Sequence, residues 1–182
     1  MKTKNLVFTG LLSTFLFSGC VHTVGQYTPD IIIPKDKIIQ KVSMENYNNN
    51  VVIQNRAGGV FCSLDSMITL PDNQPINLYI SDALKSELVF NGLYDKDSFQ
   101  KIYITLEDFE SGSDFGFSYW KFEITVKTQR GYGYKVYSIY KHDGLPNADE
   151  SCIDHTSHFV PAVKQLVNEI VKDPSFHNLF VN

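Results

Sequence analysis

The sequence predicts an α+β fold, a two-layer sandwich in which an antiparallel sheet carries two main helices on one face. Two observations predict it. Two segments have an apolar stripe at helical spacing, and three consecutive segments between them have the alternating pattern of strands. Helices and sheets with one apolar face each need another layer to cover that face. Placing both helices on the same side of the sheet satisfies both requirements.

The first helix is predicted over residues 76–91. Ile80, Leu84 and Leu88 follow one another at intervals of one helical turn, which places them on one face. Gly92 comes directly after this segment, where a residue in the left-handed conformation commonly closes a helix.

Three strands are predicted over residues 101–109, 118–129 and 132–140. The middle one has the clearest period of two, with one apolar face and one mainly polar face, as expected of a half-buried strand. Arg130 and Gly131 interrupt the alternation, so the second and third strands form a hairpin. Consecutive antiparallel strands favour a meander. The apolar face of the middle strand consists of Trp120, Phe122, Ile124 and Val126.

The second main helix is predicted over residues 157–172, with a short terminal helix after it. Thr156 or Ser157 is expected to cap the long helix, and Pro161 is tolerated in its first turn. The terminal helix is expected to begin with Asp173 as its cap.

The remaining segments are shorter. Residues 44–50 are rich in turn formers, and residues 51–55 and 66–70 each predict a short strand. Residues 142–152 are expected to form a loop.

The N-terminus predicts a lipid anchor. The apolar run over residues 6–17 is preceded by two positively charged residues, Lys2 and Lys4. It is shorter than the roughly 20 residues that a membrane span needs, and the two features together indicate a signal peptide. Phe17-Ser18-Gly19-Cys20 resembles the lipobox of bacterial lipoproteins. That resemblance implies cleavage before Cys20 and attachment of lipid chains, such as palmitate, to this cysteine. Several chains give firm attachment.

The predicted organisation has three parts. Residues 1–19 are a cleaved signal peptide, residues 20–36 an extended tether, and residues 37–182 a single α+β domain in the periplasm. In lipoproteins of bacteria with two membranes, aspartate after the lipidated cysteine is the common signal for the inner membrane. Val21 stands there, so the resemblance implies the outer membrane.

The charge of the chain argues against a nucleic-acid partner. The net charge of −4 becomes −6 when the segment with Lys2 and Lys4 is removed. Affinity for nucleic acid depends on clustered Lys and Arg, which this composition does not provide.

Cys62 and Cys152 are interpreted as a disulfide, because the predicted compartment is oxidising. Two buried thiols are one alternative. A zinc site built from Cys152, His155 and His158, with His142 nearby, is another. That ligand set lacks a second nearby cysteine and a reinforcing motif, so the prediction is that no metal is bound.

The sequence contains none of the common catalytic motifs, including GxSxG, HExxH and the P-loop. Cys152 and His155 could form a nucleophilic pair, but a disulfide would consume the thiol. We therefore expect a non-enzymatic protein without a cofactor, with an unrecognised hydrolase as the alternative.

Aromatic side chains predict a surface for a protein partner. If the helices cover the face of the sheet that contains Trp120, the opposite face carries more apolar area than solvent favours. Strand propensity alone, or cover by residues 31–36, would also account for these side chains. The candidate partner surface consists of Tyr103, Phe115, Phe117, Tyr119 and Tyr137.

Four stretches resemble the YajG-like family of small bacterial lipoproteins. They are the lipobox at Cys20, ISDALKSELVFNGLYD (80–95), the tyrosine-rich hairpin, and the tail VKQLVNEIVKDPSFHNLFVN, in which His177 is expected to pack or cap rather than catalyse. The resemblance implies a lipid-anchored outer-membrane protein facing the periplasm. The expected role is binding an envelope protein in assembly or maintenance of a complex. The alternative is a module that binds a small ligand or cell-wall fragment, or hydrolyses one.

Overall fold

The computed structural model of the chain describes residues 20–35, 38, 40–46, 60–61, 66–114, 116–144 and 148–180. The predicted strand at 51–55, Cys62 and Phe115 lie outside these residues. Within the described ranges no helix combines the length and hydropathy of a membrane span.

The main sheet has four strands in the order β2-β5-β6-β7. Its three long strands, β5 (Lys101–Asp114), β6 (Phe117–Thr128) and β7 (Gly133–Asp143), form the predicted antiparallel meander. The sheet is mixed rather than wholly antiparallel, because β2 (Ser43–Asn46) pairs with β5 in parallel. Sequence analysis had assigned most of β2 to a turn. A parallel neighbour needs a crossover, and the intervening chain with its helix supplies one.

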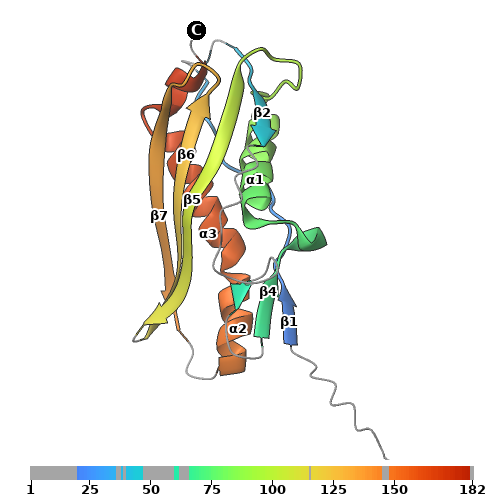
Figure 1. Cartoon of the computed structure of the whole chain (residues 1–182), viewed down its shortest axis with the longest axis vertical. Helices are drawn as coiled ribbons and strands as arrows, with labels where there is room; N and C mark the ends of the chain where they lie inside the picture. Colours follow the sequence, from blue (N-terminus) through green and yellow to red (C-terminus); the bar gives the residue numbers. More distant parts are fainter. Residues whose placement is uncertain are drawn as a thin grey trace, which may run out of the picture.

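Two long helices, α1 (Ile76–Phe90) and α3 (Phe159–Lys172), cover one face of this sheet (Figure 1). The fold class is therefore the predicted two-layer α+β sandwich. Apolar side chains from both layers form one continuous core. The largest fully buried side chains include Trp120, Phe122, Phe159, Phe176 and Phe180.

A bulge in β5 keeps the alternation of this long strand aligned with the core. Ile102, Ile104 and Leu106 face the helices, but the pairing with β6 shifts between Leu106 and Asp108. The extra residue changes the parity, so that Phe109, an odd-numbered position, packs beside Trp120 and Phe122. The sequence alternation alone had not indicated this shift.

The helix α1 ends as predicted. Gly92 has a φ of +68°, and Leu93 donates its backbone N–H to the carbonyl of Leu88 at 2.8 Å. Gly92 donates to Val89 at 2.9 Å, so the two bonds together form a Schellman motif. Leu88 and Leu93 are both buried, which fixes the direction of the chain as it leaves the helix.

The helix predicted over 157–172 is confirmed as α3, and a further helix precedes it. A first helix, α2 (Ala148–Ser157), occupies part of the segment expected to be a loop, and α3 begins after His158. Neither Thr156 nor Ser157 caps α3; its N-cap is His158, without a side-chain hydrogen bond. Pro161 has no N–H to donate to the carbonyl of Ser157, which is a reason for the break at this position.

The chain ends in a short 3-10 helix, η3 (Phe176–Phe180), where a terminal helix was predicted. Asp173 accepts the backbone N–H of Ser175 at 2.7 Å through its carboxylate, so its capping role is confirmed. Phe176, Leu179 and Phe180 are fully buried against the body.

A second, smaller sheet lies at one end of the molecule (Figure 1). Its order is β1-β4-β3, formed by β1 (Cys20–Thr23), β4 (Ser66–Thr69) and β3 (Val60–Phe61), and β1 runs parallel to β4. The strand predicted at 66–70 is thus present. β1 begins at Cys20, so this part of the expected tether belongs to a sheet.

Residues 24–35, here called the N-terminal strap, run along α1 in an extended conformation rather than as a free tether. The fully buried carboxylate of Glu87 accepts the hydroxyl of Tyr27 at 2.7 Å and the backbone N–H groups of Asp30 and Ile31 at 3.1 and 3.0 Å. One helical turn later, Asn91 continues the contact. Its side chain accepts the N–H of Ile33 at 3.0 Å and donates to the carbonyl of Ile31 at 2.8 Å.

We predict that Glu87→Gln destabilises the protein by about 2–3 kcal/mol, because an amide cannot accept all three hydrogen bonds and one donor of the strap then faces an NH₂ group. Urea denaturation measures the loss. The matched control Asp82→Asn changes an exposed carboxylate on the same helix and should alter stability by less than about 0.5 kcal/mol. Hydrogen exchange at Ile31 no faster in Glu87→Gln than in the unmodified protein would contradict this account of the strap.

Candidate functional site

The predicted aromatic surface lies on the face of the sheet opposite the helices. Phe117, Tyr119 and Tyr137 occupy outward positions on β6 and β7, and Tyr103 does so on β5. Tyr137 is exposed, whereas Tyr103, Phe117 and Tyr119 are partly covered. Phe115 was also predicted here but lies outside the described residues.

Lysines cover several of these rings. The Nζ atom of Lys141 lies 4.6 Å from the ring centroid of Phe117, and that of Lys121 lies 5.7 Å from the ring centroid of Tyr137. Lys121 also pairs with Glu110 at 3.2 Å. Cations over aromatic faces are attracted by the ring electrons. The surface is therefore a mixture of charges and rings rather than a continuous apolar patch.

Tyr119 lies flat across Gly112 on the neighbouring strand. A Cβ atom at Gly112 would come within 2.7 Å of the Tyr119 hydroxyl, so a larger residue there would displace the Tyr119 side chain. The hydroxyl donates to Glu110 at 2.7 Å. This bond, followed by the bond from Lys121, holds the pKa of Glu110 below its usual range. Tyr119 is thus occupied within the sheet, which gives it a structural role.

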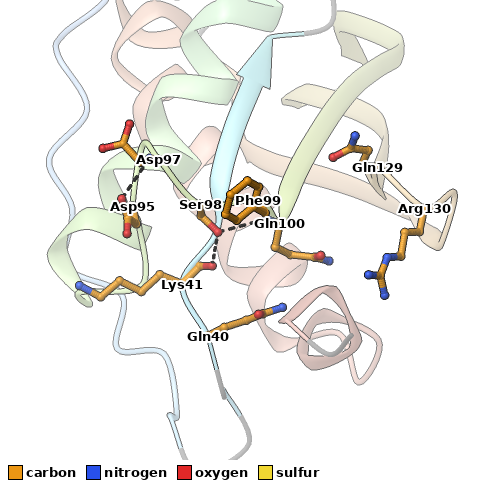
Figure 2. A pocket seen from close by; sticks show the side chains of 9 residues that line it. All are labelled: Gln40, Lys41, Asp95, Asp97, Ser98, Phe99, Gln100, Gln129 and Arg130. Carbon is orange, nitrogen blue, oxygen red and sulfur yellow. Dashed lines mark hydrogen bonds between the residues drawn. The ribbon is translucent and has the colours of Figure 1, made fainter.

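A polar pocket of about 830 Å³ lies at the end of the molecule opposite the small sheet. Figure 2 shows Asp95, Asp97 and Lys41 on one side and Gln129 and Arg130, from the turn between β6 and β7, on the other. Two acidic and two basic side chains line it, so it favours no ligand of one charge sign. Among the described residues, the lining consists of Gln40, Lys41, Asp95, Asp97, Ser98, Phe99, Gln100, Gln129 and Arg130.

Hydrogen bonds fix the wall of this pocket on either side of Phe99, whose side chain is exposed to solvent. Ser98 donates through its hydroxyl to the carbonyl of Lys41 at 2.7 Å, and Gln100 donates through its side chain to the carbonyl of Leu179 at 2.8 Å. Between these two anchored residues, Phe99 is 97% exposed. Phe99 is therefore a single apolar side chain in contact with solvent beside an otherwise polar pocket.

Three histidines meet at the other end of the molecule, where β7 passes the junction of α2 and α3. His142 is buried near the end of β7, His155 is buried in the last turn of α2, and His158 is half-buried at the break. The ring of His155 stacks on Trp120 with centroids 4.0 Å apart and planes 5° apart. The rings of His142 and His158 stack at 4.1 Å.

Hydrogen bonds connect this histidine cluster. The Nε2 atom of His142 lies 2.8 Å from Nδ1 of His155, and Nδ1 of His158 lies 3.1 Å from the hydroxyl of Tyr140. Asp154 lies between the two remaining nitrogens. One of its oxygens is 3.2 Å from Nδ1 of His142, and the other is 3.6 Å from Nε2 of His158. The cluster thus has one carboxylate for two converging imidazoles.

Burial keeps two of the histidines neutral. Burial first, and then the neighbouring His142 and His158, lowers the pKa of His155 to about 3. Burial also lowers the pKa of His142, with His158 as the second cause. Neutral imidazoles carry a free nitrogen lone pair, which is the form that binds metal ions.

The structure changes two parts of the zinc hypothesis, the role of Cys152 and the choice of acidic ligand. The structure brings together the three histidines that were considered for zinc, but Cys152 is buried and disulfide-bonded and has no thiol to offer. Cys62 lies outside the described residues, so its pairing with Cys152 stays a prediction. Asp154, one residue from His155, was missed as a possible ligand. The sequence signal available was the spacing of His155 and His158, with Asp154 four residues before the second histidine.

His177 has a packing position, as expected from its place in the tail. Its ring contacts Phe176 edge-on with centroids 6.2 Å apart. Its buried Nδ1 atom has no hydrogen-bond partner among the residues that the structure describes.

The chain is similar to known proteins in fold but not in sequence. No protein-family model matches the chain, and no curated protein matches it in sequence. The chain is similar in fold to a crystal structure of protein XCC0632 from Xanthomonas campestris, described as DUF330. The TM-score is 0.52 and the sequence identity 13%, over 83% of this chain and 91% of that chain. At this identity the likeness shows the fold alone.

We predict that the metal-free protein loses stability as pH falls below about 6.5, the value at which histidine titrates in an unfolded chain. Because the folded pKa of His155 is lowered, the unfolded state takes up the proton first. The free energy of unfolding then decreases from about pH 6.5 toward the folded pKa, by up to about 1.4 kcal/mol per pH unit for one group. Urea denaturation of chelator-treated protein across this range measures the slope.

The variant His155→Phe should reduce that slope, because it keeps a ring on Trp120 and removes the titrating group. His22→Gln, on β1, should keep the full slope. An unchanged slope in His155→Phe would show that His155 does not cause the acid sensitivity.

Proposed function

We propose that this protein is a lipid-anchored outer-membrane lipoprotein of the YajG-like kind. In this proposal it faces the periplasm and binds an envelope protein without catalysing a reaction. The lipobox that ends at Cys20, the 80–95 segment and the C-terminal tail support the family and the location. The polar pocket lined by Lys41, Asp95, Asp97 and Arg130, here called the distal pocket, supports a binding role. So does the outward face of the sheet, where Glu110 accepts hydrogen bonds from Tyr119 and Lys121.

The observation that carries the proposal is the direct continuation of Cys20 into β1. Cys20 pairs with Ser66 in the small sheet, so no spacer separates a lipidated Cys20 from the folded body. The N-terminal strap then fastens the chain to α1. A lipid on Cys20 would hold the small sheet and α2 beside the membrane, with the long axis of the body leading away from it (Figure 1).

This orientation places the polar pocket and Phe99 at the membrane-distal end. Phe99 and the turn containing Arg130 would be the first groups to meet a protein in the periplasm (Figure 2). The outward face of the sheet, with Tyr137 exposed, is the second surface available. We therefore place the main partner contact at the distal end, with the sheet face as the surface predicted from sequence.

A ligand-binding module is the alternative function, and the pocket itself favours it. A volume of about 830 Å³ lies within the range of small-molecule sites. Its polar lining would suit a polar fragment, such as one derived from the cell wall, more than an apolar one.

In-cell photocrosslinking tests the proposal. A photoreactive phenylalanine analogue at Phe99 should capture one dominant envelope protein, because this side chain is nearly fully exposed at the distal end. The same analogue at Tyr137 reports on the sheet face, and at Asp82, which is exposed on α1, it serves as the matched control. Mass spectrometry identifies the captured protein.

The variant Cys20→Ser separates anchored from unanchored protein in the same experiment. Capture at Phe99 that disappears with Cys20→Ser supports an anchored adaptor. Capture at Tyr137 alone would move the contact to the sheet face. Recovery of only uncrosslinked protein at both positions would contradict the partner-binding function and favour the ligand-binding alternative.

A further inference from the structure

We propose that His142, Asp154 and His158 form a binding site for a divalent transition-metal ion, with Zn²⁺ as the reference ion. This inference does not depend on the proposed partner. The site joins β7 to the junction of α2 and α3, near the end of the molecule where Cys20 lies (Figure 1).

The ligand atoms already converge. One nitrogen or oxygen atom from each of the three residues lies within 4.8 Å of the other two. Zinc binds imidazole nitrogen and carboxylate oxygen at about 2.0–2.2 Å, which places tetrahedral ligand atoms roughly 3.3 Å apart. The 3.2 Å between His142 and Asp154 already satisfies this spacing. His158 lies 3.6 Å from Asp154 and is half-buried. Its ring stacks on that of His142, so binding the ion requires the His158 ring to rotate out of this stack until the Nε2 lone pair faces the site.

The outer hydrogen bonds are those that metal-binding histidines need. A histidine that binds metal through one nitrogen commonly donates its other N–H to a fixed acceptor, which sets the ring orientation. For His158, with Nε2 facing Asp154, the hydroxyl oxygen of Tyr140 can accept from Nδ1 at 3.1 Å. For His142, Nδ1 faces Asp154 and Nε2 can donate to Nδ1 of His155 at 2.8 Å.

Protonation of His142 distinguishes the metal-free and metal-bound arrangements. Its Nδ1 atom lies beside two acceptors, the carbonyl of Asp143 at 3.0 Å and the carboxylate of Asp154, so without metal this nitrogen carries the proton. Metal binding requires the other tautomer, with the proton on Nε2. His155 accepts that hydrogen bond once its own proton has moved to its Nε2. No net proton is gained or lost by the two rings.

The site is accessible but built from the protein interior. The His142 side chain is 3% exposed, whereas those of Asp154 and His158 are about 30% exposed, so an ion can enter from solvent on one side. Three protein ligands leave a fourth position for water, as in zinc sites that keep an open coordination position. Two imidazoles and one carboxylate suit zinc and its transition-metal neighbours more than magnesium, which prefers oxygen ligands.

The test is titration of the full chain, purified from membranes without a histidine tag and treated with EDTA, by isothermal calorimetry with Zn²⁺. We expect one equivalent to bind saturably, a rise in Tm on binding, and no comparable heat with Mg²⁺. Asp154→Asn and His158→Gln should each weaken Zn²⁺ binding at least about tenfold. The matched controls Asp95→Asn, in the distal pocket, and His22→Gln, on β1, should bind as the unmodified protein does.

Circular dichroism of each variant confirms that it is folded, and Co²⁺ provides a second measurement on the unmodified protein. A visible absorption spectrum typical of tetrahedral cobalt with nitrogen and oxygen ligands supports the site. Absence of saturable binding of one equivalent would overturn the proposal. So would full retention of Zn²⁺ affinity in the folded double variant Asp154→Asn, His158→Gln. In either case the cluster would be a hydrogen-bonded core feature.

Discussion

The stack of Trp120 on His155 is the contact on which one whole end of the molecule depends. Trp120 is fully buried near the start of β6, an inner strand of the sheet. It packs edge-on against Phe159 and donates its indole N–H to the carbonyl of His155 at 3.3 Å. It therefore fixes the last turn of α2 and the first turn of α3 to the same point of the sheet. Because α2 also contacts β1 and β4, the position of the small sheet follows from this stack.

A polar residue at the centre of a core is tolerated only when its hydrogen bonds are satisfied. His155 has its flat face on Trp120, and one ring nitrogen bonded to His142. His142, on β7, provides this partner through its Nε2 atom. Its other ring nitrogen, Nδ1, then faces Asp154. The histidine cluster is thus a direct consequence of building this junction with an imidazole where other folds would use an apolar side chain.

The elements predicted correctly from the sequence are those with a strong apolar period. The helix α1, the three-stranded meander and most of α3 follow from alternation or helical spacing, and Gly92 marked a helix end that the structure confirms. The helix α2 was missed because its buried positions are Cys152, His155 and Thr156, which form no apolar stripe. The strand β2 was missed because its four residues pair only through a crossover whose path no local pattern reveals.

The same distinction applies to the sites. Short sequence spacing already suggested three of the cluster residues, because His155 and His158 lie in one short stretch and His142 lies nearby. Asp154 could be assigned only once the backbone showed that its carboxylate faces both rings. The distal pocket could not be predicted at all, since the chain before β2, the loop before β5 and the β6–β7 turn each contribute residues that have no shared motif.

The two sites lie at different distances from Cys20, the proposed point of lipid attachment. The distal pocket and the histidine cluster lie at opposite ends of the long axis, and β1 begins at the cluster end (Figure 1). A metal ion at the cluster would connect β7 with α2, the helix that packs on β1. It would therefore stiffen the connection between the small sheet and the main sheet, without contacting the pocket. If metal binding changed crosslinking at Phe99, the effect would have to pass through the sheet, α1 or α3, because these elements run between the two ends.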